Sequence, residues 1–314
     1  MERLSIIVPC YNEEATVEAF FRTASAVCRE LSGVETEYIF VDDGSADRTM
    51  DIVRGLAEKH SGVRWLSFSR NFGKEAAMFA GLEHARGDYV AVMDVDLQDP
   101  PELLPELLEA VREGGYDCAA VRRVDRKGEP PIRSWFARQF YKVINKMSRT
   151  EIVDGARDFR LMTRQMVDAI LRLTEYNRFS KGIFSWVGFR TKWVETVNVE
   201  RSGGESKWSF FKLLIYALDG IIAFSTAPLA IASVLGLVFC VVAFFAIVVV
   251  IVRQLVWGGS AYGWPSLVCI ILLVTGIQLF CIGIVGQYLA KTYLEVKGRP
   301  IYILRERGGD HEDQ

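Results

Sequence analysis

The chain has 314 residues, 50% of them hydrophobic, and a formal net charge of −2 at pH 7. This length is enough for one sizeable domain and an additional segment. The nearly balanced charge argues against a dedicated nucleic-acid-binding protein, because such proteins carry a strongly basic surface.

The N-terminal part of the chain alternates short apolar runs with amphipathic segments. Strands are predicted over residues 4–9, 38–41, 63–68, 90–93 and 116–121, with helices between them, including one from about 74 to 84. Asn12 is expected to cap the first helix, and Ser45 or Asp47 the second. Strands that alternate with helices build βαβ units and a parallel sheet, so the predicted class is α/β, with an edge strand over 191–197.

Two carboxylates, Asp94 and Asp96, follow the fourth predicted strand directly. Ligands of α/β proteins bind just beyond the carboxyl ends of such strands. Two neighbouring carboxylates repel each other unless a cation lies between them. Oxygen ligands of this kind suit Mg²⁺ or Mn²⁺, which also bind substrate phosphates. An Asp-x-Asp pair also occurs at ordinary acidic strand ends, so the assignment depends on the polar segments that accompany it.

Two later segments carry further charged candidates. Asp158 lies between Arg157 and Arg160, which favour its charged form; a plain ion-pair network is the alternative interpretation. The glycine-containing segment from Arg201 to Lys207 has basic ends and could close over a phosphate. Taken alone, a segment of this kind is more often a linker.

The C-terminal third is strongly apolar. Residues 220–252 contain no charged side chain, and neither do residues 254–290. Each run exceeds the roughly 20 apolar residues that cross a bilayer, so membrane spans are predicted over 228–252 and 266–290. The link between them holds one basic residue, Arg253, whereas the tail after them holds five. The positive-inside rule then places the N-terminal domain and both termini in the cytoplasm.

Two segments next to these spans combine aromatic, apolar and charged residues. Residues 132–148 are interpreted as an interfacial amphipathic helix, with a helix packed on the sheet as the alternative. Residues 208–225 are interpreted as a second, juxtamembrane amphipathic helix. The predicted organisation is a domain over 1–207, this juxtamembrane helix, two transmembrane helices over 226–290, and a cytoplasmic tail over 291–314.

Four motifs occur together and in order: Val8-Pro-Cys-Tyr-Asn-Glu13, Val41-Asp-Asp-Gly-Ser45, Asp94-Val-Asp96, and Arg201 followed by Ser206-Lys207-Trp208. This set resembles the family 2 glycosyltransferases of the polyprenyl-phosphate branch, which includes dolichol-phosphate-mannose synthases and bactoprenol glucosyltransferases. The resemblance covers essentially the whole chain. Residues 70–77 and 177–182 look most like bacterial members that transfer glucose or N-acetylglucosamine. The Gln-x-x-Arg-Trp motif of the processive synthases is lacking, which implies transfer of a single sugar.

The resemblance implies a Rossmann-like GT-A fold with a mostly parallel sheet, and it implies roles for individual positions. Matched position by position, the resemblance implies that the nucleoside is bound by Pro9, Tyr11, Glu13 and Asp43, and that Asp94 and Asp96 form a metal turn with Gln98 beside it. It implies that Asp158 is a candidate base. The acceptor phosphate would be bound by Arg201 and Lys207, with help at the membrane face from Arg133 and Arg138.

The implied reaction is inverting transfer of one sugar, glucose or N-acetylglucosamine, from a UDP-sugar to undecaprenyl phosphate. It would use Mg²⁺ or Mn²⁺ at the cytoplasmic face of the cell inner (plasma) membrane, in contact with membrane lipid. A flippase and a downstream transferase would then act in the same pathway. Two alternatives stay open: a non-catalytic membrane scaffold with a nucleotide-binding domain, and a transferase with another acceptor, such as a diacylglycerol or a protein. The sequence does not decide between a monomer and a homo-oligomer.

Overall fold

One mixed sheet of eight strands forms the centre of the computed structural model, in the order β7-β5-β6-β4-β1-β2-β3-β8. The strands are β1 (Glu2–Cys10), β2 (Val34–Asp42), β3 (Val63–Phe68), β4 (Tyr89–Val92), β5 (Cys118–Arg123), β6 (Ala156–Thr163), β7 (Thr191–Thr196) and β8 (Leu304–Gly308). The central strands β4, β1, β2 and β3 are parallel, whereas β6 and β8 run antiparallel to their neighbours. The α/β class with a parallel sheet centre is therefore confirmed.

The structure describes residues 1–124, 142, 145–146, 152–196, 221–222, 225–257 and 263–309. The interfacial helix predicted over 132–148 and the juxtamembrane helix predicted over 208–225 lie almost wholly outside these residues. The glycine-containing segment over 201–207 lies outside them as well.

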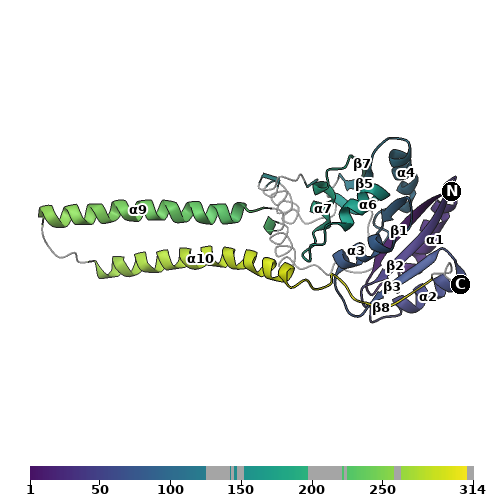
Figure 1. Cartoon of the computed structure of the whole chain (residues 1–314), viewed down its shortest axis with the longest axis horizontal. Coiled ribbons are helices and arrows are strands. Elements are labelled where there is room, and N and C mark those ends of the chain that lie inside the picture. Colours follow the sequence, from purple (N-terminus) through teal and green to yellow (C-terminus); the bar gives the residue numbers. More distant parts are fainter. Residues whose placement is uncertain are drawn as a thin grey trace.

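Helices cover both faces of the sheet (Figure 1). They are α1 (Val17–Arg29), α2 (Thr49–Lys59), α3 (Lys74–His84), the short 3₁₀ helix η1 (Pro101–Leu103), α4 (Leu104–Arg112), α6 (Arg164–Leu171) and α7 (Ser180–Trp186). One apolar cluster packs α1, α2 and α4 on one face, and a second packs α3, α6 and α7 on the other. Both faces are covered, which explains why the central strands read as continuous apolar runs.

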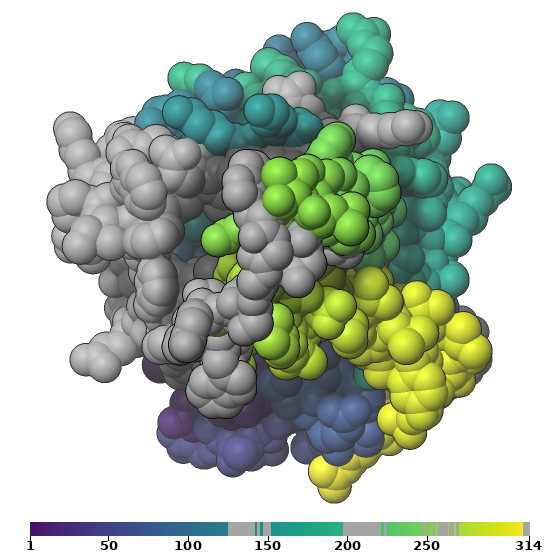
Figure 2. Space-filling view, turned by 90° about the vertical axis from the view of Figure 1, so that its left-hand side faces the viewer, coloured from purple at the N-terminus to yellow at the C-terminus, as the bar shows by residue number. Residues whose placement is uncertain are grey.

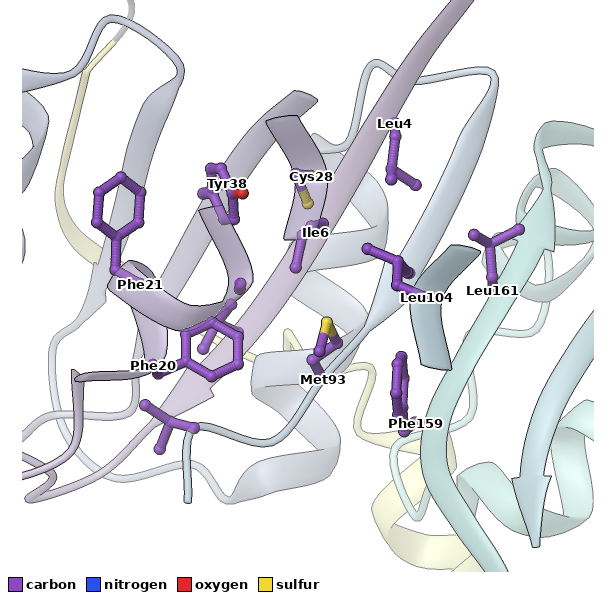
Figure 3. Packing of buried hydrophobic residues seen from close by; sticks show 14 of the residues in the cluster. Leu4, Ile6, Phe20, Phe21, Cys28, Tyr38, Met93, Leu104, Phe159 and Leu161 are labelled. Carbon is purple, nitrogen blue, oxygen red and sulfur yellow. The ribbon is translucent and has the colours of Figure 1, made fainter. Parts of the chain in front are cut away.

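Alternate residues of β1 serve the two apolar clusters. Ile6 points into the cluster with α1, whereas Ile7 points into the cluster with α3, and both side chains are fully buried. Figure 3 shows the first cluster, with Phe20 and Phe21 of α1 lying against the sheet. These contacts fix the positions of the loops that follow each strand.

The C-terminal residues add a strand that the sequence did not predict. β8 pairs antiparallel with β3, and its yellow ribbon runs along that edge of the sheet in Figure 1. Just before β8, the ring of Tyr302 stacks on Phe68 with centroids 5.0 Å apart, and the Tyr302 hydroxyl donates to Glu83 at 2.5 Å. Arg54 pairs with Glu306 of β8 at 2.6 Å. Part of the predicted cytoplasmic tail is therefore docked on the domain.

Two long helices, α9 (Ala227–Trp257) and α10 (Trp264–Val296), extend side by side away from the sheet (Figure 1). Within them, 227–253 and 270–296 are long and apolar enough to cross a membrane, and their side chains are not buried inside the protein. Seen from their free end in Figure 2, the helices stand in front of the domain, with the N-terminal segments in purple and blue below them. The two predicted spans thus coincide with two candidate membrane helices.

The inner end of α10 contacts the domain directly. The Glu295 carboxylate accepts hydrogen bonds from the backbone N–H groups of Tyr176 at 3.0 Å and Asn177 at 3.3 Å. The Lys291 ammonium donates to the side-chain oxygen of Asn177 at 3.2 Å. The second candidate membrane helix is therefore attached to the segment that leads into α7.

The predicted helix caps differ from those in the structure. Asn12 does not cap α1; its side-chain oxygen accepts the N–H of Ala46 at 2.9 Å, and its own N–H donates to Ser45 at 2.9 Å. The prediction for Asn12 is therefore wrong, because the side chain joins two loops instead. Asp47 accepts the N–H of Thr49, the first residue of α2, at 3.0 Å, but the N-cap is Arg48, whose side chain makes no capping hydrogen bond, so neither Ser45 nor Asp47 occupies the cap position.

Candidate active site

Asp94 and Asp158 come together at the edge of the sheet where the central strands end. β4 and β6 are antiparallel with Val92 opposite Arg160, so the residues two positions further on, Asp94 and Asp158, continue this register. The ammonium of Lys74 lies between them, 2.7 Å from an Asp94 oxygen and 2.5 Å from an Asp158 oxygen. Lys74 is the first residue of α3, the helix that follows β3 in the chain. The turn after β4, the first residues of β6 and the start of α3 therefore supply one charged cluster.

This cluster is accessible to ligands. The side chain of Lys74 is 43% exposed, and those of Asp94 and Asp158 are 22% and 18% exposed. Burial alone would raise the pKa of Asp158, but the positive charges of Lys74 and Lys181 outweigh it and hold that pKa well below its usual value. Asp158 is therefore a carboxylate at neutral pH, paired with a cation, and a weak proton acceptor in this state.

The turn that carries Asp94 and Asp96 is held by a residue whose role the sequence did not reveal. Arg157 donates to both carboxylate oxygens of Asp99, at 2.9 and 3.1 Å, and to the side-chain oxygen of Gln98 at 3.2 Å. Asp99 is only 3% exposed. The Nε–H of Arg157 is shared by both oxygens of the buried carboxylate, and a second guanidinium nitrogen binds Gln98, so two neighbouring residues of the turn are tied to β6. In the sequence, Arg157 precedes Asp158 and Asp99 follows Gln98, and this adjacency is the only sequence feature that points to their role.

A second layer of contacts fixes β6 and α7 around Asp158. Arg160 is 2% exposed, and its guanidinium lies 3.7 Å from the ring centroid of Phe184 in α7. The same guanidinium donates to the carbonyl of Arg157 at 2.8 Å. Glu75 of α3 accepts the N–H of Ser180 at 3.0 Å and the Ser180 hydroxyl as well. Strands and helices from distant parts of the chain thus surround the cluster with rigid packing.

The predicted nucleoside residues lie at the ends of β1 and β2. Pro9 pairs in register with Val41 inside the sheet, and Tyr11 is 43% exposed just beyond it. The Glu13 carboxylate accepts the hydroxyl of Thr16 at 2.7 Å. These side chains share the edge that carries Asp94, because β1 is the parallel neighbour of β4. The positions of these residues are therefore compatible with the nucleotide-sugar donor, implied by the sequence, lying along this edge of the sheet.

Asp43 has a clear structural contact. Its buried carboxylate accepts the backbone N–H groups of Phe72 at 2.6 Å and Gly73 at 2.9 Å, just before α3 begins. Burial raises the pKa of Asp43 to about 6, and the two N–H donors only partly oppose this shift. Asp43 therefore fixes the loop that leads into Lys74.

Gly44 allows two of these loops to approach each other closely. It adopts φ +73°, and a Cβ built there would lie 2.6 Å from the carbonyl carbon of Arg70. A left-handed backbone and this lack of space both favour glycine. The Asp-Asp-Gly-Ser motif thus shapes the contact between the loops after β2 and β3.

A divalent cation fits the residues of this turn, although they cannot complete its coordination alone. Among the described residues, no three acidic, histidine or cysteine side chains converge as a metal-binding group. Mg²⁺ is commonly held by one or two carboxylates together with substrate phosphates and water. Asp94 and Asp96 are two carboxylates of one turn; Asp96 accepts the N–H of Gln98 at 3.1 Å, and the Lys74 ammonium 2.7 Å from Asp94 shows that Asp94 accepts a positive charge at this position.

Arg133, Arg138, Arg201 and Lys207 lie outside the described residues, so their assignment to the acceptor phosphate stays a prediction.

Comparison with known proteins gives consistent matches over nearly the whole chain. Residues 5–171 match the family described as Glycosyl transferase family 2. The "Prophage bactoprenol glucosyl transferase homolog" of Escherichia coli is 43% identical over 303 residues, which cover 96% of this chain and 98% of that protein. The "SfII prophage-derived bactoprenol glucosyl transferase" of Shigella flexneri is also 43% identical, covering 97% and 98%. Among solved structures, a complex of glucosyl-3-phosphoglycerate synthase from Mycobacterium tuberculosis with Mn²⁺ and UDP-glucose matches with a TM-score of 0.46 and 21% identity, covering 70% of this chain and 77% of that one.

Proposed function

The chain belongs to glycosyl transferase family 2, and we propose that it transfers a single glucose or N-acetylglucosamine from a UDP-sugar to undecaprenyl phosphate. Two observations support this proposal. The similar proteins named as bactoprenol glucosyl transferases extend over almost the entire chain, including both candidate membrane helices. The observation that carries the chemistry is the meeting of Asp94 and Asp158 around Lys74 at the strand ends.

The donor would lie along the edge formed by β2, β1 and β4. Tyr11 and Asp43 stand at its nucleoside end, and Asp94 and Asp96 stand at its diphosphate end. Asp94 and Asp96 would hold Mg²⁺ or Mn²⁺, which when bound neutralises charge on the departing diphosphate. Loss of one such electrostatic contact at a reaction centre costs roughly 10²–10³ in rate.

The acceptor would approach from the side of Asp158. One phosphate oxygen attacks the anomeric carbon, the bond from that carbon to the diphosphate oxygen breaks, and UDP leaves with the bonding electrons. Attack from the face opposite the leaving group inverts the anomeric configuration. A phosphate with a second pKa of about 6 is largely dianionic at pH 7, so the nucleophile needs no strong base. The lowered pKa of Asp158 agrees with a role in orienting cationic groups.

The candidate membrane helices fit an acceptor that stays in lipid. α10 ends beside the segment leading into α7, and α7 in turn contacts Glu75 of α3 through Ser180. These contacts connect the inner end of α10, through α7, to α3, the helix whose first residue is Lys74. The distribution of basic residues supports a cytoplasmic position of this domain. A tethered enzyme meets a lipid-bound acceptor at a high effective concentration.

The proposal is tested with the purified full-length protein in lipid nanodiscs. The protein receives Mg²⁺, undecaprenyl phosphate and, in separate reactions, radiolabelled UDP-glucose or UDP-N-acetylglucosamine. Labelled lipid is expected with one of the donors, and none is expected with undecaprenol, which lacks the phosphate. No labelled lipid with either donor, or equal labelling of undecaprenol, would overturn the proposed reaction.

A matched pair of variants links this activity to the turn. Asp96→Asn should lower turnover roughly 10²–10³-fold. Asp51→Asn makes the same chemical change on α2, where the side chain is 73% exposed, and should leave turnover unchanged. Equal turnover in both variants would remove Asp96 from the reaction centre.

A further inference from the structure

Lys74 has the central position in the charged cluster, yet the reaction described above gives it no part. Its ammonium links the carboxylates of Asp94 and Asp158. Residues 70–77 resemble the bacterial members of the family, but this resemblance gives Lys74 no chemical role.

The backbone at Lys74 is fixed from both sides. The residue before it, Gly73, donates its N–H to the buried Asp43 carboxylate at 2.9 Å. The residue after it, Glu75, accepts both hydrogen-bond donors of Ser180 at the start of α7. The side chain itself remains 43% exposed. A lysine with a rigid backbone and an accessible ammonium is preorganised to bind an anion, while its flexible stem lets the ammonium move.

The charges around Lys74 change when substrates arrive. Without substrates, the Lys74 ammonium forms ion pairs with the carboxylates of both Asp94 and Asp158. A divalent cation on Asp94 and Asp96 competes with the ammonium for Asp94, because both are positive and like charges repel. The ammonium has three N–H donors, and Asp158 needs only one of them. Once Asp94 is released, the other donors are available to phosphate oxygens.

We propose that Lys74 is a phosphate-binding residue of the reaction centre, paired with Asp94 until a divalent cation replaces it there, and afterwards held by Asp158. This inference rests on the proposed function, because it assumes that a metal-bound sugar nucleotide and a phosphate acceptor meet at this cluster. The phosphate that Lys74 contacts belongs either to the donor or to the acceptor. Asp158 is then a positioning residue, which keeps the ammonium next to the anion.

The first test measures metal binding without any substrate. Mn²⁺ is titrated into the full-length protein in nanodiscs, and free Mn²⁺ is followed by electron paramagnetic resonance. Lys74→Met removes the competing cation and should bind Mn²⁺ about ten-fold more tightly than the wild type, which corresponds to one decade in the dissociation constant. Lys74→Arg keeps the charge and should stay within about three-fold of the wild type. Lys59→Met, at the exposed end of α2, is the matched control and should not differ from the wild type.

The second test identifies the phosphate. At saturating Mn²⁺, UDP binding is measured by calorimetry, and the KM for undecaprenyl phosphate is measured by transfer. If Lys74 contacts the donor, Lys74→Met should weaken UDP binding at least ten-fold. If it contacts the acceptor, UDP binding should be unchanged and the KM for undecaprenyl phosphate should rise at least ten-fold.

Three results would overturn the inference: Mn²⁺ affinity in Lys74→Met equal to that of the wild type, failure of the wild type to bind Mn²⁺, or unchanged UDP binding and acceptor KM in Lys74→Met. A melting temperature of the variant close to that of the wild type shows that the fold is intact, and Lys74→Gln, which also removes the charge, serves where Lys74→Met does not fold. If the wild type transfers no sugar, the metal and UDP titrations still report on Lys74. Failure of the proposed reaction can therefore be distinguished from failure of this inference.

Discussion

The ion pair between Arg157 and Asp99 allows a direct test of what holds the metal turn. Replacing Arg157 with Met keeps much of the apolar stem but removes both hydrogen bonds to a carboxylate that is 3% exposed. Breaking a buried pair by removing one partner costs about 3–5 kcal/mol. The side chain of Arg157 is 26% exposed, so water can partly replace it, and we expect a loss near the lower limit, about 3 kcal/mol.

The loss should depend on pH in a defined direction. Burial already raises the pKa of Asp99 above its usual value despite the nearby charge of Arg157. Without Arg157 that pKa rises further, so the folded state of the variant binds a proton more tightly than the unfolded state does. Stability of the variant relative to the wild type therefore falls as pH rises above the raised folded-state pKa of Asp99 in the wild type, until Asp99 is ionised in the folded variant as well. The destabilisation should be largest at pH 8 and smaller at pH 5.

The measurement is thermal unfolding of the full-length protein in detergent, at pH 5 and pH 8. For a domain of this size, about 3 kcal/mol corresponds to a decrease in melting temperature of roughly 6–12 °C. The double variant Arg157→Met/Asp99→Asn should recover part of the loss, because no buried charge remains. Arg48→Met breaks a pair whose side chains are 79% and 42% exposed and should change stability by less than about 0.5 kcal/mol. A variant Arg157→Met that melts like the wild type at pH 8 would refute this account of the turn.

Three further predictions concern the loops and the helix attachment. Gly44→Ala should destabilise the protein by about 2 kcal/mol or more, because φ +73° and the 2.6 Å approach to Arg70 leave no room for Cβ; a melting temperature unchanged within 2 °C, on the order of 0.5 kcal/mol, would contradict this. Because the folded-state pKa of Asp43 is raised to about 6, its ionisation costs stability as the pH rises from about 4 to 6, and Asp43→Asn should reduce this loss. Parallel pH–stability curves for variant and wild type would argue against the raised pKa. Glu295→Ala removes the acceptor for the N–H of Asn177 and should raise the KM for undecaprenyl phosphate several-fold with UDP binding unchanged, whereas an unchanged acceptor KM would show that this contact does not position the site.

Much of the sheet could be predicted because its signals are local. The helix predicted over 74–84 has the same bounds as α3, and the strands before Asp43 and Asp94 were recognised from continuous apolar runs. The edge strand over 191–197 agrees with β7 to within one residue. Buried strands and long apolar helices can be predicted because the residues that they bury are apolar, and this pattern is visible in the local sequence.

The elements that were missed depend on distant partners. β8 contains Arg305, Glu306 and Arg307, and such charges on an edge strand hide it from an apolar pattern. β6 was not predicted as a strand, so its antiparallel pairing with β4, which brings Asp158 opposite Asp94, was also not foreseen. Both cases involve pairing between segments far apart in the chain, for which no local periodicity exists.

The same reason explains the charged contacts of the site. The bridging position of Lys74 requires α3, β4 and β6 to be placed in three dimensions. The sequence did suggest an ion-pair network around Asp158, but with the neighbouring arginines as partners. Arg160 instead lies buried on Phe184, and the ammonium of Lys74 pairs with the carboxylate.

The central claim is that Asp94 and Asp96 bind a divalent cation together with the diphosphate of the donor. The most direct measurement is a crystal structure of the full-length protein grown with Mn²⁺ and UDP, in which the anomalous signal of manganese locates the ion. We expect the ion within about 2.3 Å of oxygens from both carboxylates and of the diphosphate. An ion or a diphosphate bound away from this turn would contradict the claim.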